Sequence, residues 1–181
     1  MEYLLETARL RARAFRPGDA ARLYAIHLED NVRQWIPNES YADLAEAEDA
    51  VRFFADCVNA GRLPFVLAVE TREGELIGDT GVNEVDGQPG EVEIGYVISG
   101  RFSGQGLATE LVGAMTVFAA ARFGVSALYG RVMRGNSASE RVLQKNGYAL
   151  AWEETGAEDD PYGRGMLVYV KISEKSKGAE P

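Results

Sequence analysis

The stretch "GYVISGRFSGQGLATEL", residues 95–111, has the composition of an anion-binding turn. Its first part is apolar and β-branched, Gly100, Gly104 and Gly106 lie close together in its middle, and its last part has helical periodicity. The first N–H groups of a helix lack intrahelical partners, and the helix dipole favours negative charge there. Glycine also lets the backbone approach a ligand closely. The pattern predicts a phosphate-binding turn, although an isolated Gly-x-Gly more often only shapes a tight connection.

Three kinds of phosphate-binding loop can be compared with this turn. A Walker A loop ends in Gly-Lys-Ser/Thr, which "GQGLAT" does not contain. A dinucleotide fingerprint needs Gly or Ala where this chain has Thr109, and it needs an acidic residue after the next strand, "ALYGRVM", where none is present. The third kind is the Arg/Gln-x-x-Gly-x-Gly/Ala loop that binds the pyrophosphate of coenzyme A. The segment "RFSGQG", residues 101–106, matches every fixed position of that loop.

Composition excludes several other classes of protein. The chain has 181 residues, a net charge of −9 and a pI of about 4.7, which is a poor match for nucleic acid but suits cationic partners. One histidine, His27, and one cysteine, Cys57, exclude most zinc sites, Ser-His-Asp triads and any internal disulfide. We expect His27 to be an exposed surface residue on the first helix. The apolar runs are too short to cross a bilayer and the N-terminus does not resemble a signal peptide, so we expect a cytoplasmic protein without a membrane partner.

The elements that would position the glycine turn alternate between strands and helices. Alternating and β-branched patterns predict strands over 7–15, 65–70, 76–82, 92–99, 126–133, 148–152 and 166–172. Helical periodicity predicts helices over 20–30, 41–58, 107–123 and 137–146, with Asp19, Ser40 and Asn136 as N-caps of the first, second and fourth. The order indicates one mixed α/β domain over 1–173, followed by a loose polar tail over 174–181.

Four segments resemble the GNAT acetyltransferases, and among them the Rim-type branch that acetylates protein N-termini. They are, in order, "LETARLRAR", "GELIGDTGV", "EIGYVISGRFSGQGLATEL" and "RGNSASERVLQKNGY". The chain departs from that branch at Gly100, where proline is usual, and at Ser103, where tryptophan is usual. The resemblance implies a mostly antiparallel sheet of about six to seven strands, splayed at its central strands and flanked by about four helices.

The resemblance also implies where acetyl-CoA binds. The pyrophosphate would lie on backbone N–H groups between Arg101 and Gly106, pantetheine would pair with the strand near Val97 and Ile98, and Asn136 would border the cofactor. The full set of implied cofactor-binding residues is Val97, Ile98, Arg101, Phe102, Ser103, Gly104, Gln105, Gly106, Leu107, Ala108, Asn136 and Ser139. No metal is implied.

Acetyl transfer to an amine requires reactants held in line, a base for the ammonium and a proton for the leaving thiolate. Many members of the family supply that proton from a tyrosine, but the aligned residue here is Leu143, so the resemblance assigns the proton to Ser139. Glu93, on the strand beside the acetyl group, and Glu158, in the late acidic loop, are the two candidate bases; we rank Glu93 first. The alternative for each is a purely structural or solvated position.

The function expected from the sequence is acetyl-CoA-dependent N-acetylation of a primary amine, with a protein N-terminal α-amine as one candidate acceptor. A small amine of the polyamine or aminoglycoside kind is an alternative, because the acidic stretch at 153–160 suits any cationic acceptor. A module that binds acyl-CoA without turnover is a second alternative, since Leu143 replaces the usual tyrosine. The acceptor and the oligomeric state, including a homodimer, stay open.

Overall fold

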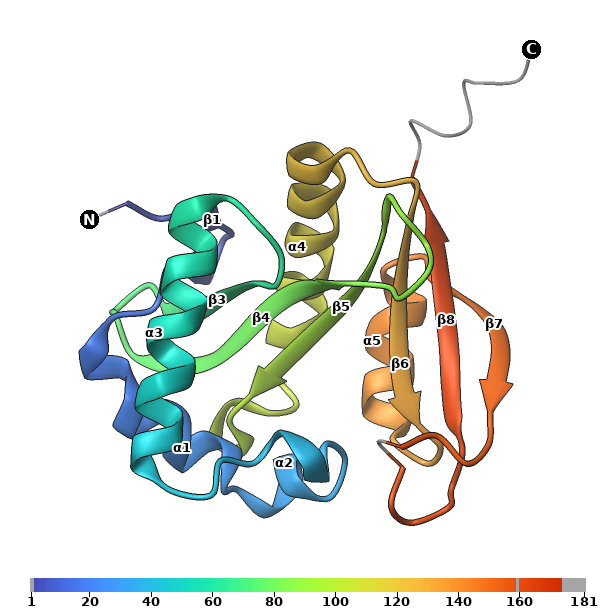
Figure 1. The fold of residues 1–181 in the computed structure, drawn as a ribbon, viewed down its shortest axis with the longest axis horizontal. Coiled ribbons are helices and arrows are strands. Elements are labelled where there is room, and N and C mark those ends of the chain that lie inside the picture. Colours follow the sequence, from blue (N-terminus) through green and yellow to red (C-terminus); the bar gives the residue numbers. More distant parts are fainter. Residues whose placement is uncertain (1, 159, 174–181) are drawn as a thin grey trace.

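The computed structural model describes residues 2–158 and 160–173. They form one eight-stranded sheet in the order β1-β2-β3-β4-β5-β6-β8-β7 (Figure 1). Neighbouring strands are antiparallel, except that β5 and β6 are parallel. The strands are β1 (Leu5–Glu6), β2 (Leu10–Arg13), β3 (Phe65–Thr71), β4 (Leu76–Glu84), β5 (Glu91–Ile98), β6 (Ala127–Met133), β7 (Ala149–Glu154) and β8 (Met166–Ile172).

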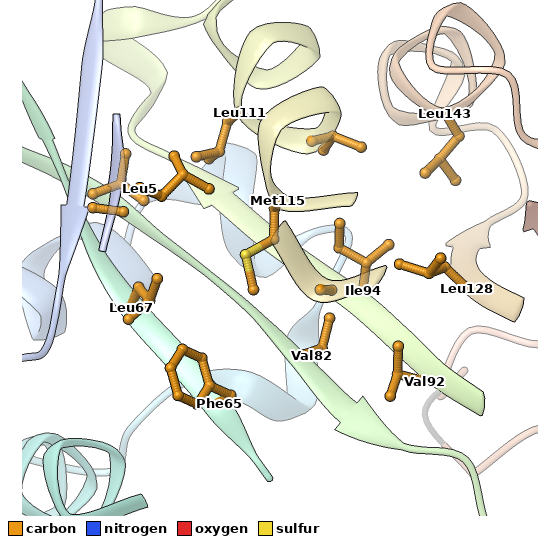
Figure 2. Packing of buried hydrophobic residues seen from close by; sticks show 14 of the residues in the cluster. Leu5, Phe65, Leu67, Val82, Val92, Ile94, Leu111, Met115, Leu128 and Leu143 are labelled. Carbon is orange, nitrogen blue, oxygen red and sulfur yellow. The ribbon is translucent and has the colours of Figure 1, made fainter. Parts of the chain in front are cut away.

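Helices cover both faces of the sheet. They are α1 (Ala20–His27), α2 (Asp30–Arg33), α3 (Leu44–Ala60), α4 (Leu107–Phe123) and α5 (Ser137–Lys145), with short 3₁₀ turns η1 (Pro17–Asp19), η2 (Pro37–Glu39) and η3 (Gly100–Phe102). Side chains of β3 alternate between two hydrophobic clusters: Leu67 and Val69 pack with α4, whereas Ala68 packs with α1 and α3. Figure 2 shows Leu111 and Met115 of α4 directed at residues of the sheet. The sheet is therefore the middle layer of three.

The helix that follows the glycine turn begins and ends where the sequence predicts. Gly106 (φ 77°) precedes α4 and Gly124 (φ 64°) follows it, and both have the left-handed conformation that glycine adopts without strain. The other central helix, α5, begins at its predicted cap, since Asn136 Oδ1 accepts a hydrogen bond from the Ser139 N–H. These two helices bring the glycine turn and Ser139 to the same region of the molecule.

Two expectations about the start of the chain are wrong. Of the strand predicted over 7–15, only Leu10–Arg13 (β2) is a strand, because Thr7 Oγ1 accepts from the Leu10 N–H and the Thr7 N–H donates to the Leu10 carbonyl, which closes a turn after β1 (Leu5–Glu6). Asp19 does not cap α1 with its side chain. Its carboxylate accepts hydrogen bonds from the buried guanidinium of Arg13 at 2.7 and 3.0 Å.

The predicted cap of the second long helix is also wrong. Asp43 caps α3 by accepting from the Glu46 N–H, while the Ser40 hydroxyl donates to the His27 carbonyl. The helix α2 was not predicted, and with the extra N-terminal strand it raises the totals to eight strands and five α-helices in the described residues, against the six to seven strands and about four helices expected. The expected tail, 174–181, lies outside the described residues. No helix in the described ranges is long and apolar enough to cross a membrane.

Candidate active site

The sheet separates between β5 and β6. Their parallel pairing covers only residues Glu91–Glu93 and Ala127–Tyr129, and beyond these residues the two strands diverge (Figure 1). A cavity of about 570 Å³ opens there, and its walls include the consecutive residues 93–98 of β5 and 131–133 of β6. Because consecutive residues of a strand alternate between faces, a wall made of them exposes backbone as well as side chains.

The glycine turn forms part of the wall of this cavity. Gly104 (φ 76°) and Gly106 (φ 77°) are both left-handed, and a Cβ built on Gly104 would meet no atom within 4 Å. Of the predicted cofactor residues in the turn and at the start of α4, those that line the cavity are Phe102, Ser103, Gly104, Gly106, Leu107 and Ala108. The open space above Gly104 and the N-terminus of α4 fit a diphosphate.

Two predicted cofactor residues direct their side chains elsewhere. The guanidinium of Arg101 pairs with the Glu75 carboxylate at 2.9 Å and its side chain is 70% exposed. Gln105 does not line the cavity, and its carbonyl oxygen accepts a hydrogen bond from Arg9 Nη1 at 2.8 Å. Any part that Arg101 or Gln105 plays in binding would therefore come from the backbone.

Arg9 holds the glycine turn against α4, a contact that the sequence did not predict. Its backbone N–H and its Nε donate to the Glu110 carboxylate at 2.9 and 2.6 Å, while Nη1 holds the Gln105 carbonyl. A Cβ on Gly106 would lie 3.6 Å from Arg9 Nη2. Arg9 thus fixes the conformation of the turn and places a positive charge beside it.

Ser139 lines the cavity and contacts Tyr96 in its wall. The Tyr96 hydroxyl lies 2.5 Å from Ser139 Oγ, and Asn136 lines the cavity beside them. Burial raises the pKa of Tyr96 to about 12, although the hydrogen bond with Ser139 opposes the rise. The sequence did not predict Tyr96 as a site residue, although it lies in the "EIGY" segment that carries the resemblance.

Leu143 has no titratable group and its side chain does not reach the cavity. Its side chain is 1% exposed and packs against Gly130, where an added Cβ would lie within 2.8 Å of it. It does not line the cavity. The residue that aligns with the usual tyrosine is therefore part of the hydrophobic core.

The two candidate bases lie in different places. Glu93 lines the cavity, on the same face of β5 as Val97, whereas Ile94, Tyr96 and Ile98 lie on the opposite face and pack with the α4 cluster. Glu158 is exposed and outside the cavity wall, and its carbonyl accepts from Asn38 Nδ2 at 3.3 Å. The cavity thus has Ser139 and Tyr96 at one face of the sheet and Glu93 at the other.

The face that carries Glu93 continues into α2 and η2, a wall that the sequence did not predict. Its lining residues include Asn31, Trp35, Asn38 and Glu39. Arg131 lies on this side too, and its guanidinium is paired with Glu154 at 2.6 Å. The described residues contain no group of three or more His, Cys, Asp or Glu side chains that could hold a metal ion.

His27 is buried rather than exposed, contrary to our expectation. Its side chain is 4% exposed and lies between Asp79 of β4 and the carbonyl of Glu39 in η2. It therefore supports the wall that carries Glu39, without lining the cavity itself. Sequence position alone could not reveal this, because the two partners come from distant segments.

Comparisons with known proteins agree with this architecture. A family described as the acetyltransferase (GNAT) domain matches residues 9–149. The uncharacterised N-acetyltransferase YoaA of Bacillus subtilis is 28% identical over 146 residues, which is 80% of this chain and 82% of that protein.

Two solved structures share the fold at low identity. RimL, a ribosomal L7/L12 α-N-protein acetyltransferase in complex with coenzyme A, superposes with a TM-score of 0.79 at 19% identity and covers 94% of this chain and 98% of its own. The ribosomal-protein-S5-alanine acetyltransferase of Vibrio fischeri superposes with a TM-score of 0.82 at 16% identity and covers 97% of this chain and 98% of its own.

Proposed function

This chain belongs to the GNAT acetyltransferase family and is an acetyltransferase, and we propose that it transfers the acetyl group of acetyl-CoA directly to a primary amine, with a protein N-terminal α-amine as the first candidate acceptor. The family and the mixed α/β fold expected from the four sequence segments are both confirmed. The identity of the acceptor and the parts played by individual residues are proposals.

One observation carries the proposal: the cavity lies where β5 and β6 separate, it is lined from both faces of the sheet, and the glycine turn is part of its wall. A linear acyl donor whose extended chain is attached to a diphosphate suits such a site. Its diphosphate would lie on the N–H groups of the turn and of α4, and its chain would run along the unpaired edge of β5. Acetyl-CoA supplies the activated acyl group, and the protein supplies position and charge.

Each residue on the donor side of the site would then have a defined part. Gly104 and Gly106 let the backbone of the turn approach the diphosphate, and the backbone at Val97 and Ile98 pairs with the chain of the donor and provides an N–H for the acetyl oxygen. Asn136 fixes the first turn of α5 and so the position of Ser139. Ser139 faces the leaving sulfur.

The amine would enter from the opposite face. Glu93 and Glu39 line the cavity on that side, and carboxylates attract an ammonium group and can take its proton through a water molecule. We rank Glu93 above Glu158 as base because Glu158 lies outside the cavity wall. The relative RimL is described as acting on the α-amine of a ribosomal protein, which makes an N-terminal amine our first choice over a polyamine or an aminoglycoside.

A direct experiment separates the acceptors. The protein is incubated with acetyl-CoA and either short peptides with a free N-terminus, the same peptides with a blocked N-terminus, spermidine or an aminoglycoside. Release of free thiol is then measured. We expect turnover with free peptides and none with blocked ones. Turnover confined to spermidine or the aminoglycoside would replace the peptide acceptor, and coenzyme A binding without turnover of any amine would contradict the proposed reaction.

A further inference from the structure

The hydroxyl groups of Tyr96 and Ser139 form one hydrogen bond between two elements that border the cavity. Tyr96 comes from β5 and Ser139 from the first turn of α5, and both side chains belong to the cavity wall. Their oxygen atoms are 2.5 Å apart, so one of the two hydroxyls donates to the other. The Ser139 N–H is held by Asn136 Oδ1 at 3.2 Å, which fixes the serine relative to the tyrosine.

The chemistry of the two groups indicates which one donates. If Ser139 donated, the phenolic hydrogen would have only the Ser139 carbonyl oxygen as an acceptor, at 3.4 Å, among the described residues. If Tyr96 donates, its hydrogen is fully used in the 2.5 Å contact. A phenol is also the more acidic of the two hydroxyls and therefore the better donor. The hydrogen of Ser139 is then left to point into the cavity.

A second pair of hydroxyls in the same molecule provides a comparison. Tyr148 and Thr116 lie 2.7 Å apart, and burial raises the pKa of Tyr148 to about 12, as it does for Tyr96. There, however, Thr116 Oγ1 donates onward to the Val112 carbonyl at 2.7 Å, so the chain of hydrogen bonds ends within α4. Among the described residues, Ser139 Oγ has no such onward acceptor. The chain that starts at Tyr96 ends in the cavity.

We propose that Tyr96 is a positioning residue for acetyl transfer: by donating to Ser139 Oγ, it directs the Ser139 hydrogen at the sulfur atom that leaves. This inference rests on the proposed function, because it requires a thioester in the cavity. It assigns Ser139 the part of a hydrogen-bond donor to the developing thiolate, in place of the proton donor expected from the resemblance.

The step balances without a proton from either hydroxyl. The acceptor nitrogen forms the new C–N bond with its lone pair, the C–S bond breaks, and its electron pair stays on sulfur; nothing is oxidised or reduced. The nitrogen loses its proton to Glu93 through water or to solvent, and the sulfur takes a proton from solvent. A thiol ordinarily has a pKa of about 8.5, far below that of Tyr96, so the phenol keeps its hydrogen. Two successive hydrogen bonds stabilise the thiolate, and each strengthens the other.

The pKa of the coenzyme A thiol in its complex with the protein measures this effect without turnover. It is read from the ultraviolet absorbance of the thiolate as the pH is raised. We expect the bound thiol to have a lower pKa than free coenzyme A, and Tyr96→Phe and Ser139→Ala each to raise it by about 1. The double variant should match Ser139→Ala, because Tyr96 acts through the serine.

Single-turnover acetyl transfer provides the second measurement. Tyr96→Phe and Ser139→Ala should each slow the step by about 10-fold with the affinity for coenzyme A unchanged, and the double variant should be no slower than Ser139→Ala. The matched control is Tyr148→Phe, which removes a hydrogen bond between the same kinds of group outside the cavity wall. It should reduce thermal stability about as much as Tyr96→Phe does, yet leave the thiol pKa and the rate unchanged.

The outcomes separate this inference from the proposed function. If the wild-type protein and Tyr96→Phe transfer acetyl groups equally fast while Ser139→Ala is slow, Tyr96 has no positioning part and the proposed reaction stands. If the effects of Tyr96→Phe and Ser139→Ala add in the double variant, Tyr96 does not act through Ser139. If the wild-type protein binds acetyl-CoA but transfers nothing to any amine, the reaction itself is wrong and this inference falls with it.

Discussion

His27 Nε2 lies 2.8 Å from Asp79 Oδ2, and His27 Nδ1 lies 2.8 Å from the carbonyl oxygen of Glu39. A carboxylate and a carbonyl oxygen both accept hydrogen bonds, so the two contacts form together only when both ring nitrogens carry a proton. Burial lowers the pKa of His27, but Asp79 and the Glu39 carbonyl raise it more, and the net result lies above the usual value. The protonated ring therefore joins β4 to η2, the segment whose Glu39 lines the cavity.

The first prediction concerns stability and pH. A histidine whose pKa is raised in the folded state contributes stability that is fully present below its unfolded pKa of about 6.5 and is lost as pH rises through the folded pKa. We therefore expect wild-type protein to exceed His27→Gln in free energy of unfolding most clearly below about pH 6.5, with the difference shrinking at higher pH. Urea unfolding of both proteins across this range measures it.

The same residue offers a direct titration, because the chain contains one histidine. The ring proton signal in a nuclear magnetic resonance spectrum should titrate with a midpoint above about 6.5, and Asp79→Asn should lower that midpoint. The neighbouring ring of Tyr41, whose centroid lies 5.1 Å away, is common to both proteins. A wild-type midpoint at or below that of Asp79→Asn would contradict the assignment of Asp79 as the main stabilising partner.

The second prediction tests the glycine turn. Gly104→Glu places a negative side chain in the open space where the diphosphate should lie, so the affinity for coenzyme A should fall by at least about 10-fold. Gly74→Glu is the matched control: Gly74 also has a positive φ (89°), a Cβ there also meets nothing within 4 Å, and it lies outside the cavity wall. Both variants should lose about 1–2 kcal/mol of stability to backbone strain. Isothermal titration with coenzyme A should separate them; equal affinities would place the diphosphate elsewhere.

The third prediction concerns Arg9. Arg9→Met removes the hydrogen bonds that the guanidinium makes to the Gln105 carbonyl and to Glu110, so the turn loses its fixed conformation. Because the Arg9 side chain is half exposed, we expect a moderate loss, about 5-fold in affinity for coenzyme A. Arg72→Met is the matched control. The Arg72 guanidinium likewise donates to a carboxylate, that of Glu6, and to a carbonyl, that of Thr7, but Arg72 lies outside the cavity wall. Equal affinities for the two variants would show that the turn needs no support from Arg9.

The fourth prediction concerns the base. Amines are mostly protonated at neutral pH, so a variant without the base should recover activity as pH rises and free amine becomes abundant. We expect Glu93→Gln to lower kcat/KM at neutral pH and to recover in part at high pH, while Glu158→Gln follows the wild-type profile. The pH–rate profiles of the three proteins with one acceptor measure this. The reverse order would make Glu158 the base, and three identical profiles would mean that the protein has no dedicated base.

Local patterns predicted the parts of the fold that depend on neighbouring residues. The limits of α4 and the Asn136 cap of α5 follow from glycine conformation and from a side chain bonding three residues ahead, and both are visible in the sequence. Asp19 and Ser40 have the same capping chemistry, but Asp19 bonds instead to Arg13, six positions before it, and Ser40 to the His27 carbonyl, thirteen positions before it. The ion pair between Arg13 and Asp19 forms only after β2 and η1 have been brought together.

In the candidate site, too, the sequence predicts what neighbouring residues determine and misses what distant residues determine. The glycine turn could be recognised from consecutive residues, because its function depends on backbone conformation. Tyr96 and Ser139 are 43 positions apart, and only the meeting of β5 with α5 makes them a pair. The buried position of His27 depends equally on Asp79, which lies 52 positions away. Pairing over such distances has no signature in a single sequence.

The separation of β5 from β6 has an evolutionary consequence. The pairing of these strands ends at Glu93 and Tyr129, so the strand edges beyond them offer main-chain atoms that the sheet itself does not use. Main-chain atoms are the same in every sequence, and substitutions elsewhere disturb them only by altering strand geometry or the turn. The opposite wall is formed by side chains, including those of Trp35 and Glu39, and a single substitution changes such a side chain directly. Under the proposed function, substitutions in that wall can exchange one acceptor for another while the main-chain edge of β5 keeps the same acyl donor.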